Sequence, residues 1–316
     1  MLTTLRLAKN LYRSNARFVF ELIQNAEDNH YSRAKASAAE PYIKFTIRPN
    51  KIIVDSNEDG FTPEDVEAIC RIGGSTKTRT DAQYYIGEKG IGFKSVFMVA
   101  SKVHIQSGPF SFFFEHEPGD SGMGMITPEW EVSNEALPDS LTRMTLTLLD
   151  SLDYPDLLSQ FDDLPKTLLL FLKKLGKIII DSDGVPEEAP QVTTYSCQLD
   201  ESIRRAIVLE VCEQEGEEST TESDHYHITR KSLYNLPLDG ERDYNTAEVV
   251  LAFPVDDTDS APLIYNNEVY AYLPIRDFGF PVSLITAASI KILIIYSSSF
   301  NQILLRKPVE KMSWKT

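Results

Sequence analysis

Three glycines within six residues, Gly87, Gly90 and Gly92, are the feature that most limits how this chain can fold. They lead into a helix-like stretch, and Lys89 and Lys94 lie among them. Glycine lets backbone N–H groups approach an anion closely, and a helix N-terminus adds positive potential. The run lacks the Gly-Lys-Ser/Thr ending of a P-loop and the short strand–turn–helix setting of a dinucleotide fold. It therefore predicts an anion-binding loop of another kind.

A second feature is a row of polar residues at helical spacing near the N-terminus. Glu21, Asn25 and Asp28 are four and then three residues apart, so a helix places them on one stripe. Two carboxylates and a carboxamide in one row suit Mg²⁺ coordination and activation of water. Taken alone, the row fits the solvated face of an amphipathic helix better. The opposite, apolar stripe is Val19, Leu22, Ile23 and Ala26.

Two further segments are informative only in combination. In residues 53–61 an apolar strand ends in an acidic, glycine-containing turn. A carboxylate or amide fixed there can accept a hydrogen bond from an adenine amino group, although an ordinary Asx-rich turn explains the segment at least as well. Residues 141–148 alternate polar and apolar side chains, which is typical of a core strand.

The order and spacing of these four segments resemble the N, G1, G2 and G3 boxes of the Bergerat (GHKL) ATPase superfamily. The wording is closest to the branch of sacsin-like and NO VEIN-like ATPase domains, in which "ELIQNAEDN", "NEDGF", "STKT", "GEKGIGFKSVF" and "LLLFLKKL" look like whole family phrases. The resemblance covers residues 2–180 strongly and residues 245–280 more loosely.

This resemblance implies an α+β fold of the Bergerat type, a mixed sheet under helices, with ATP between the first helix and a lid at residues 73–89. Glu21 would be the general base for the attacking water, and Asn25 would ligate Mg²⁺. Asp28 would lie near the ribose or adenine. The implied set of nucleotide-binding residues is Asn25, Asp28, Asp55, Asn57, Gly60, Lys77, Gly87, Lys89, Gly90, Ile91, Gly92, Phe93, Lys94 and Thr142.

The adenine-binding box departs from the superfamily pattern Asp-x-Gly-x-Gly. Asp55 is followed by Ser-Asn-Glu-Asp-Gly, which is one residue longer and lacks the first glycine. If the strand end sets the alignment, Asp55 takes the adenine-binding role. If Gly60 sets it, Ser56 occupies that position and Asn57 is the nearby substitute.

The composition limits the partners. The formal net charge is −16 with a pI near 4.8, so long-range electrostatics do not favour nucleic acid as a partner. The most apolar stretch, residues 282–296, contains Lys291 and is too short to span a membrane. The three cysteines have no metal spacing and predict free thiols in a reducing compartment. We therefore expect an intracellular protein, cytoplasmic or nuclear, that binds ATP and either protein clients or copies of itself.

The chain divides into three predicted parts: an ATP-binding domain at 1–184, a strand-rich domain at 185–280 and a divergent tail at 281–316. We expect the tail to come from a truncated or misjoined gene product, or else to be a divergent terminal strand and helix. Helices are predicted at 2–31, from Thr62 to about 73, at 92–100 and at 157–175. Strands are predicted at 42–48, 51–55, 102–107, 110–115, 141–149, 177–181, 191–199, 206–211, 247–255 and 263–273, with a mobile acidic loop at 213–224.

Two functions remain open at this level. Glu21 favours Mg²⁺-dependent, slow ATP hydrolysis coupled to lid closure, as in chaperone-like relatives. The altered adenine box favours a nucleotide-gated interaction module with little or no hydrolysis. A basic residue of the second domain often completes such a site, and Arg276 is a candidate.

Overall fold

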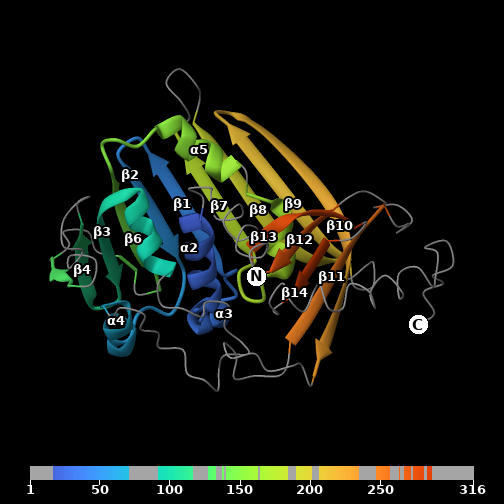
Figure 1. Cartoon of the computed structure of the whole chain (residues 1–316), viewed down its shortest axis with the longest axis horizontal. Coiled ribbons are helices and arrows are strands. Elements are labelled where there is room, and N and C mark those ends of the chain that lie inside the picture. Colours follow the sequence, from blue (N-terminus) through green and yellow to red (C-terminus); the bar gives the residue numbers. More distant parts are fainter. Residues whose placement is uncertain are drawn as a thin grey trace, which may run out of the picture. The chain divides into compact units, whose positions relative to one another are not determined.

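The computed structural model of the chain forms an α+β fold with a large mixed sheet and few helices (Figure 1). It describes residues 17–70, 92–116, 127–132, 137–138, 140–162, 164–183, 190–200, 206–234, 247–256, 263, 267–271, 273–280 and 283–286. The chain separates into two compact units. One is Met1–Cys197 with Leu209–Ser223, and the other is Gln198–Val208 with Asp224–Thr316. The sequence also predicts a link between the first two parts at residues 182–190, and residues 184–189 of it lie outside the described residues.

The sheet of the first unit has the strand order β8-β7-β1-β2-β6-β3-β4-β5. β1 and β7 run parallel, whereas β1 and β2, β2 and β6, and β6 and β3 are antiparallel neighbours. The strands are β1 (Tyr42–Arg48), β2 (Lys51–Ser56), β3 (Ala100–Ser107), β4 (Phe110–Glu115), β5 (Glu129–Trp130), β6 (Thr142–Leu148), β7 (Lys177–Ser182) and β8 (Gln191–Asp200). β8 belongs to this unit up to Cys197.

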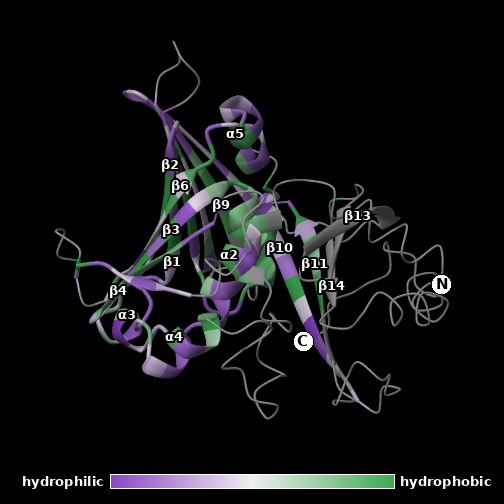
Figure 2. Ribbon diagram, turned by 60° about the vertical axis from the view of Figure 1, so that its left-hand side comes forward, coloured by the Kyte–Doolittle hydropathy of each residue, from purple (hydrophilic) through white to green (hydrophobic). Residues whose placement is uncertain are grey.

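Helices cover one face of this sheet because every second side chain of its strands is apolar and points that way. The α2 ring of Phe18 and the β1 ring of Phe45 both pack edge-on against Phe161 of α5, with ring centroids 6.1 and 5.3 Å away. Apolar residues, green in Figure 2, gather in α2 and on the strands beside it. The predicted apolar stripe of α2 is confirmed, since its four members are all buried. The helical elements are α2 (Arg17–Asp28), α3 (Ser32–Ala36), α4 (Pro63–Cys70), η1 (Gly92–Met98), α5 (Tyr154–Asp162) and η3 (Lys166–Phe171).

The predicted helix end at Tyr31 is wrong, because α2 ends at Asp28 and a separate helix, α3, begins at Ser32. The cause lies elsewhere in the sequence. The carboxylate of Asp59 accepts hydrogen bonds from the backbone N–H groups of Ser32 and Arg33, both at 2.9 Å, and so favours a new helix start there. Residues 1–16 of the predicted helix lie outside the described residues.

The single helix predicted at 157–175 is also wrong. It divides into α5 and the short 3₁₀ helix η3, with Pro165 directly before the second. Proline lacks an N–H group and crowds the preceding turn, so a continuous helix cannot pass through this position. The predicted start of α4 is confirmed: Thr62 and Asp65 bond each other reciprocally at the first turn.

The acidic segment 213–224 forms strands and not a mobile loop. β9 (Ala206–Glu215) continues to Glu215, and β10 (Glu218–Leu233) begins at Glu218. Gly216 has a φ of 59° in the turn between them, which glycine adopts without strain. Thr220 and Thr221 favour the extended backbone, although the segment is exposed and rich in charged side chains.

The second unit contains the strand order β10-β11-β14-β12-β13. Its strands after β10 are β11 (Ala247–Val255), β12 (Asn267–Ala271), β13 (Leu273–Phe280) and β14 (Ser283–Thr286). β12 and β14 are parallel, and the other pairs are antiparallel. No helix in the described part of the chain is long and apolar enough to cross a membrane.

Candidate functional site

Three neighbouring strands of the first unit, β2, β6 and β3, place hydroxyl groups side by side where these strands end or begin. Ser56 ends β2, Thr142 begins β6 and Ser107 ends β3, and Thr142 is the cross-strand partner of both serines. All three are buried on the side of the sheet that faces the helices. The hydroxyls of Ser107 and Thr142 are 2.6 Å apart. We call Ser56, Thr142 and Ser107 the hydroxyl row.

The C-terminal end of α2 meets this row through Tyr31. The Tyr31 hydroxyl donates to the carbonyl of Ala26 at 2.8 Å and lies 3.1 Å from the hydroxyl of Ser56. Burial raises the pKa of Tyr31, so this phenol stays neutral and serves as a fixed hydrogen-bonding group. The polar helix end and the strand edge are therefore parts of one region.

The acidic turn after β2 is fixed over the same region at both ends. The backbone N–H of Asp59 donates to the carbonyl of His30 at 2.8 Å, and that of Phe61 donates to the Ser107 hydroxyl at 2.8 Å. Gly60 between them has a φ of 92°, a conformation that a side chain would strain. Gly60, a predicted site residue, thus lets the turn close against the hydroxyl row.

Glu58 lies inside this turn and is the least expected residue of the region. Its side chain is 2% exposed, and neither carboxylate oxygen has a hydrogen-bond partner among the described residues. Burial raises the pKa of Glu58 to about 7, with Asp65 and Asp59 acting in the same direction and the nearby Thr142 hydroxyl acting against them. The Thr142 hydroxyl also lies 2.6 Å from the Ser107 hydroxyl, and either of these two groups can be the donor of that bond.

The three polar residues predicted on α2 lie at different depths. Glu21 and Asn25 are half-buried, and Asp28 is buried. α2 packs against η1, the helix that follows the glycine run. In the part of the chain that the structure describes, no group of three or more His, Cys, Asp or Glu side chains could hold a metal ion. Mg²⁺ that arrives with a nucleotide takes only one or two protein oxygens, usually of carboxylates, and the Asn25 amide would supply one neutral oxygen of this kind.

η1 contains Gly92, Phe93 and Lys94. The Phe93 ring is buried against Phe97 and Phe114, with centroids 6.5 and 5.9 Å away, so this side chain supports the core. Lys94 differs: its ammonium is buried and, among the described residues, has no hydrogen-bond partner. Burial lowers its pKa. Lys77, Gly87, Lys89, Gly90 and Ile91 lie outside the described residues.

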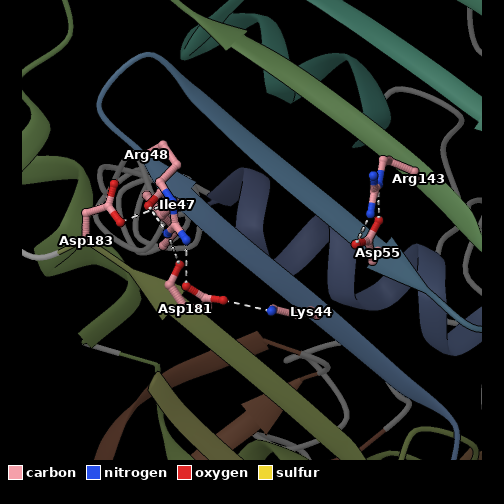
Figure 3. A network of polar contacts seen from close by, with 7 residues as sticks. All are labelled: Lys44, Ile47, Arg48, Asp55, Arg143, Asp181 and Asp183. Atoms are coloured by element: carbon pink, nitrogen blue, oxygen red, sulfur yellow. Dashed lines mark hydrogen bonds and ion pairs between the residues drawn. The ribbon is translucent and has the colours of Figure 1, made fainter. Parts of the chain in front are cut away.

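Asp55 and Asn57 are engaged away from the hydroxyl row. Asp55 points to the opposite face of the sheet, where its two oxygens accept from the Arg143 guanidinium at 2.7 and 2.9 Å (Figure 3). The Asn57 side chain accepts from the backbone of Tyr42 at 2.8 Å and donates to the carbonyl of Glu40 at 2.9 Å. The same figure shows Asp181 between Lys44 and Arg48 on this face of the sheet.

Sequence reasoning missed two buried carboxylates. Glu27 accepts from the backbone N–H groups of Lys173, Lys174 and Leu175 at 2.7–3.1 Å. It thereby connects α2, which carries the motif "ELIQNAEDN", to the end of the motif "LLLFLKKL". Glu58 had a readable signal, because Ile52, Val54 and Ser56 are buried at every second position and Glu58 continues that alternation. Arg276 lies on β13, but its side chain is not among those described.

The chain is 31% identical over 295 residues to Protein NO VEIN of Arabidopsis thaliana. The chain is therefore similar to one segment of Protein NO VEIN. The aligned stretch covers 86% of this chain and 10% of Protein NO VEIN, so the chain spans about a tenth of that relative's length. No protein-family model matches the chain.

Proposed function

We propose that the first unit is a Bergerat-type module that binds Mg·ATP and hydrolyses it slowly. The observation that carries this proposal is the convergence of the predicted boxes. Tyr31 bonds the end of α2 to Ser56, Ser56 pairs with Thr142, and α2 packs against η1. These segments are far apart in the sequence, and the superfamily uses the same four segments to surround ATP.

Each group has a chemical role in this proposal. The hydroxyl row receives the adenine end of the nucleotide. The buried, unpartnered ammonium of Lys94 and the backbone of the glycine run attract the phosphates. The Asn25 amide oxygen is the protein ligand of the metal, which supplies charge stabilisation to the phosphates when bound. Glu21, on the same helix stripe as Asn25, takes the proton of the attacking water as the new bond from water oxygen to the γ-phosphorus forms and the bond from that phosphorus to the bridging oxygen breaks, so that ADP and phosphate leave.

The geometry favours one of the two alignments of the adenine box. Asp55 is held by Arg143 on the far face, whereas Ser56 is buried in the row. This contrast supports the alignment set by Gly60, in which Ser56 occupies the adenine-binding position and Asn57 is the nearby substitute.

A second candidate is a nucleotide-gated interaction module without hydrolysis. The changed adenine box favours it, because a serine there replaces the superfamily's aspartate. Protein clients or self-association belong to this proposal equally, whether the protein is chaperone-like or regulatory.

Titration of the chain with Mg·ATP, followed by measurement of phosphate release, separates these candidates. We expect binding by the wild type, and Glu21→Ala should keep that affinity while turnover falls about 10²–10⁴-fold. Asn25→Ala should weaken binding of Mg·ATP itself. Binding without any phosphate release favours the gated module, and no binding by a folded chain contradicts both.

A further inference from the structure

We infer that the open edge of the first unit's sheet, at β5, binds an extended segment of a partner protein in which apolar and basic side chains alternate. The bound segment adds a strand beside β5. This surface uses none of the residues assigned to the nucleotide, so the inference stands or falls separately from the proposed function.

The first observation is a strand edge with unpaired backbone groups. β5 is the last strand in the order of the sheet and follows β4, which lies at the left of Figure 1. The Glu131 N–H donates to the Ser111 carbonyl of β4 at 3.1 Å, and successive residues of a strand point these groups to alternate sides. The N–H and C=O groups of Trp130 therefore point away from β4, where the described residues provide no further strand. An added chain can pair with such groups.

The second observation is an apolar surface left in water at this edge. Trp130 is 64% exposed and Val132 is 91% exposed. Trp130 is the cross-strand partner of the buried Phe112, so both point to the helix-facing side of the sheet. The Trp130 ring packs on Phe112 and Phe110, with ring centroids 5.5 and 6.4 Å away. The ring is thus held in place on one side and free to contact a partner on the other, as tryptophans that dominate binding energies are.

The third observation is negative charge on the opposite face of β5. Glu129 pairs across the strands with Phe113, and both Glu129 and Glu131 are exposed. The Glu131 carboxylate lies 3.4 Å from the Lys102 ammonium and 3.8 Å from the His104 ring, which places it on the face without helices. The Lys102 ammonium also lies over the Phe113 ring, 3.6 Å from its centroid. β5 is therefore apolar on one face and acidic on the other.

These observations together select the partner. A strand beside β5 directs alternate side chains to the two faces of the sheet. Apolar side chains on one face bury the surfaces of Trp130 and Val132, and basic side chains on the other pair with the two glutamates. A second copy of the chain fits less well, because β5 against β5 brings glutamates together and each copy has a net charge of −16.

Titration of the whole chain with a capped peptide of alternating lysine and valine tests the inference. Trp314→Phe leaves Trp130 as the single tryptophan, so its fluorescence reports binding at the edge. We expect saturable binding that changes the emission. A peptide with glutamate in place of lysine, and one with the same lysines and valines in two blocks, should bind at least about tenfold more weakly.

Backbone methylation of the peptide separates strand addition from charge attraction alone. N-methyl groups on one set of alternate residues remove the N–H groups that face β5 and should abolish binding. N-methyl groups on the other set point to solvent and should leave binding intact.

Variants of the chain test the two faces of β5, with binding measured by calorimetry. Trp130→Ala should weaken binding at least about tenfold. Tyr234→Ala, the same truncation of an exposed aromatic side chain in the second unit, should leave the affinity unchanged. Glu129→Lys combined with Glu131→Lys should reverse the preference towards the glutamate peptide, which decides the matter even if the alanine variant folds poorly.

Equal binding of the alternating and blocked peptides, tolerance of N-methyl groups on both sets, or an unchanged affinity in Trp130→Ala would each overturn the inference. Self-association of the chain that Trp130→Ala abolishes, seen by sedimentation, would overturn it in favour of a second copy at this edge. Binding of Mg·ATP is measured separately and is expected to be the same in Trp130→Ala and the wild type.

Discussion

Two buried glutamates on the helix-facing side of the first unit differ in how the fold treats them. Glu27 is 3% exposed and its oxygens accept from three consecutive backbone N–H groups, while Glu58 is 2% exposed and its oxygens accept from none of the described residues. Burial raises the pKa of both, and only Glu27 has bonds from the backbone that act against it.

The difference separates a buried carboxylate that accepts from the backbone from one that, among the described residues, does not. Glu27 accepts the backbone hydrogen bonds of the segment that follows η3. In the same place the Lys174 ammonium donates to the carbonyls of Asp28 and Asn29 at 2.8 and 2.9 Å. That region is complete by itself. Glu58 has no such backbone donors among the described residues, and the Thr142 hydroxyl is the neighbouring group that favours its ionised form.

The largest expected effect concerns Glu27. Glu27→Ala leaves three backbone N–H groups without an acceptor, one of them buried and two part-buried, so we expect the free energy of unfolding to fall by about 2–4 kcal/mol. Urea unfolding measures this, with Glu64→Ala at an exposed position as the control that should change it by less than about 0.5 kcal/mol. A loss below about 1 kcal/mol for Glu27→Ala would show that the hydrogen bonds of Glu27 contribute little to the free energy of unfolding.

The next effect concerns the pH dependence of stability. The folded-state pKa of Glu58 is raised from 4.5 to about 7, so the folded chain binds this proton more tightly than the unfolded chain. Wild-type stability is therefore fully present below pH 4.5 and falls as the pH rises to 7, by about 3 kcal/mol. Glu58→Gln lacks this loss, so its stability relative to the wild type should rise by that amount between pH 4.5 and pH 7.5. Parallel unfolding curves at both pH values would show that Glu58 is ionised without cost.

The smallest effect concerns Asp55, the carboxylate that has its partner on the opposite face. Asp55→Asn weakens a part-buried bidentate pair with Arg143, which should cost about 1 kcal/mol of unfolding free energy. The preference for ATP over GTP should not change, because this side chain points away from the hydroxyl row. Competition binding with both nucleotides measures it. A reduced preference would restore the alignment in which Asp55 reads adenine.

The sequence predicted those parts of the fold that depend on local periodicity. β1, β2 and β6 and the start of α4 lie where alternation and capping residues place them. The break after α2 could not be predicted, because it depends on Asp59, 27 residues further on from Ser32. The strands across 213–224 were missed because a run of charge resembles a loop, whereas the turn at Gly216 and the β-branched Thr220 and Thr221 favour two strands.

The site shows the same division. Residue types and spacing identified the candidates on α2 and at Thr142, but not which face of β2 each acid occupies relative to its partners. The bond between Glu27 and Lys173 joins residues 146 positions apart, and the isolation of Glu58 results from the packing of several elements around it. Such properties arise from tertiary structure and have only weak local signals.

Hydrogen–deuterium exchange with a non-hydrolysable ATP analogue and Mg²⁺ tests most directly whether the nucleotide binds between α2 and the hydroxyl row. At saturating analogue we expect slower exchange in peptides that contain residues 18–28, 56–61 and 140–145, because the ligand joins α2 to the hydroxyl row. Peptides from the exposed strands at 212–222 should exchange at the same rate with and without it. Equal exchange at α2 and the hydroxyl row under both conditions, or slowing confined to other parts of the chain, would contradict the account.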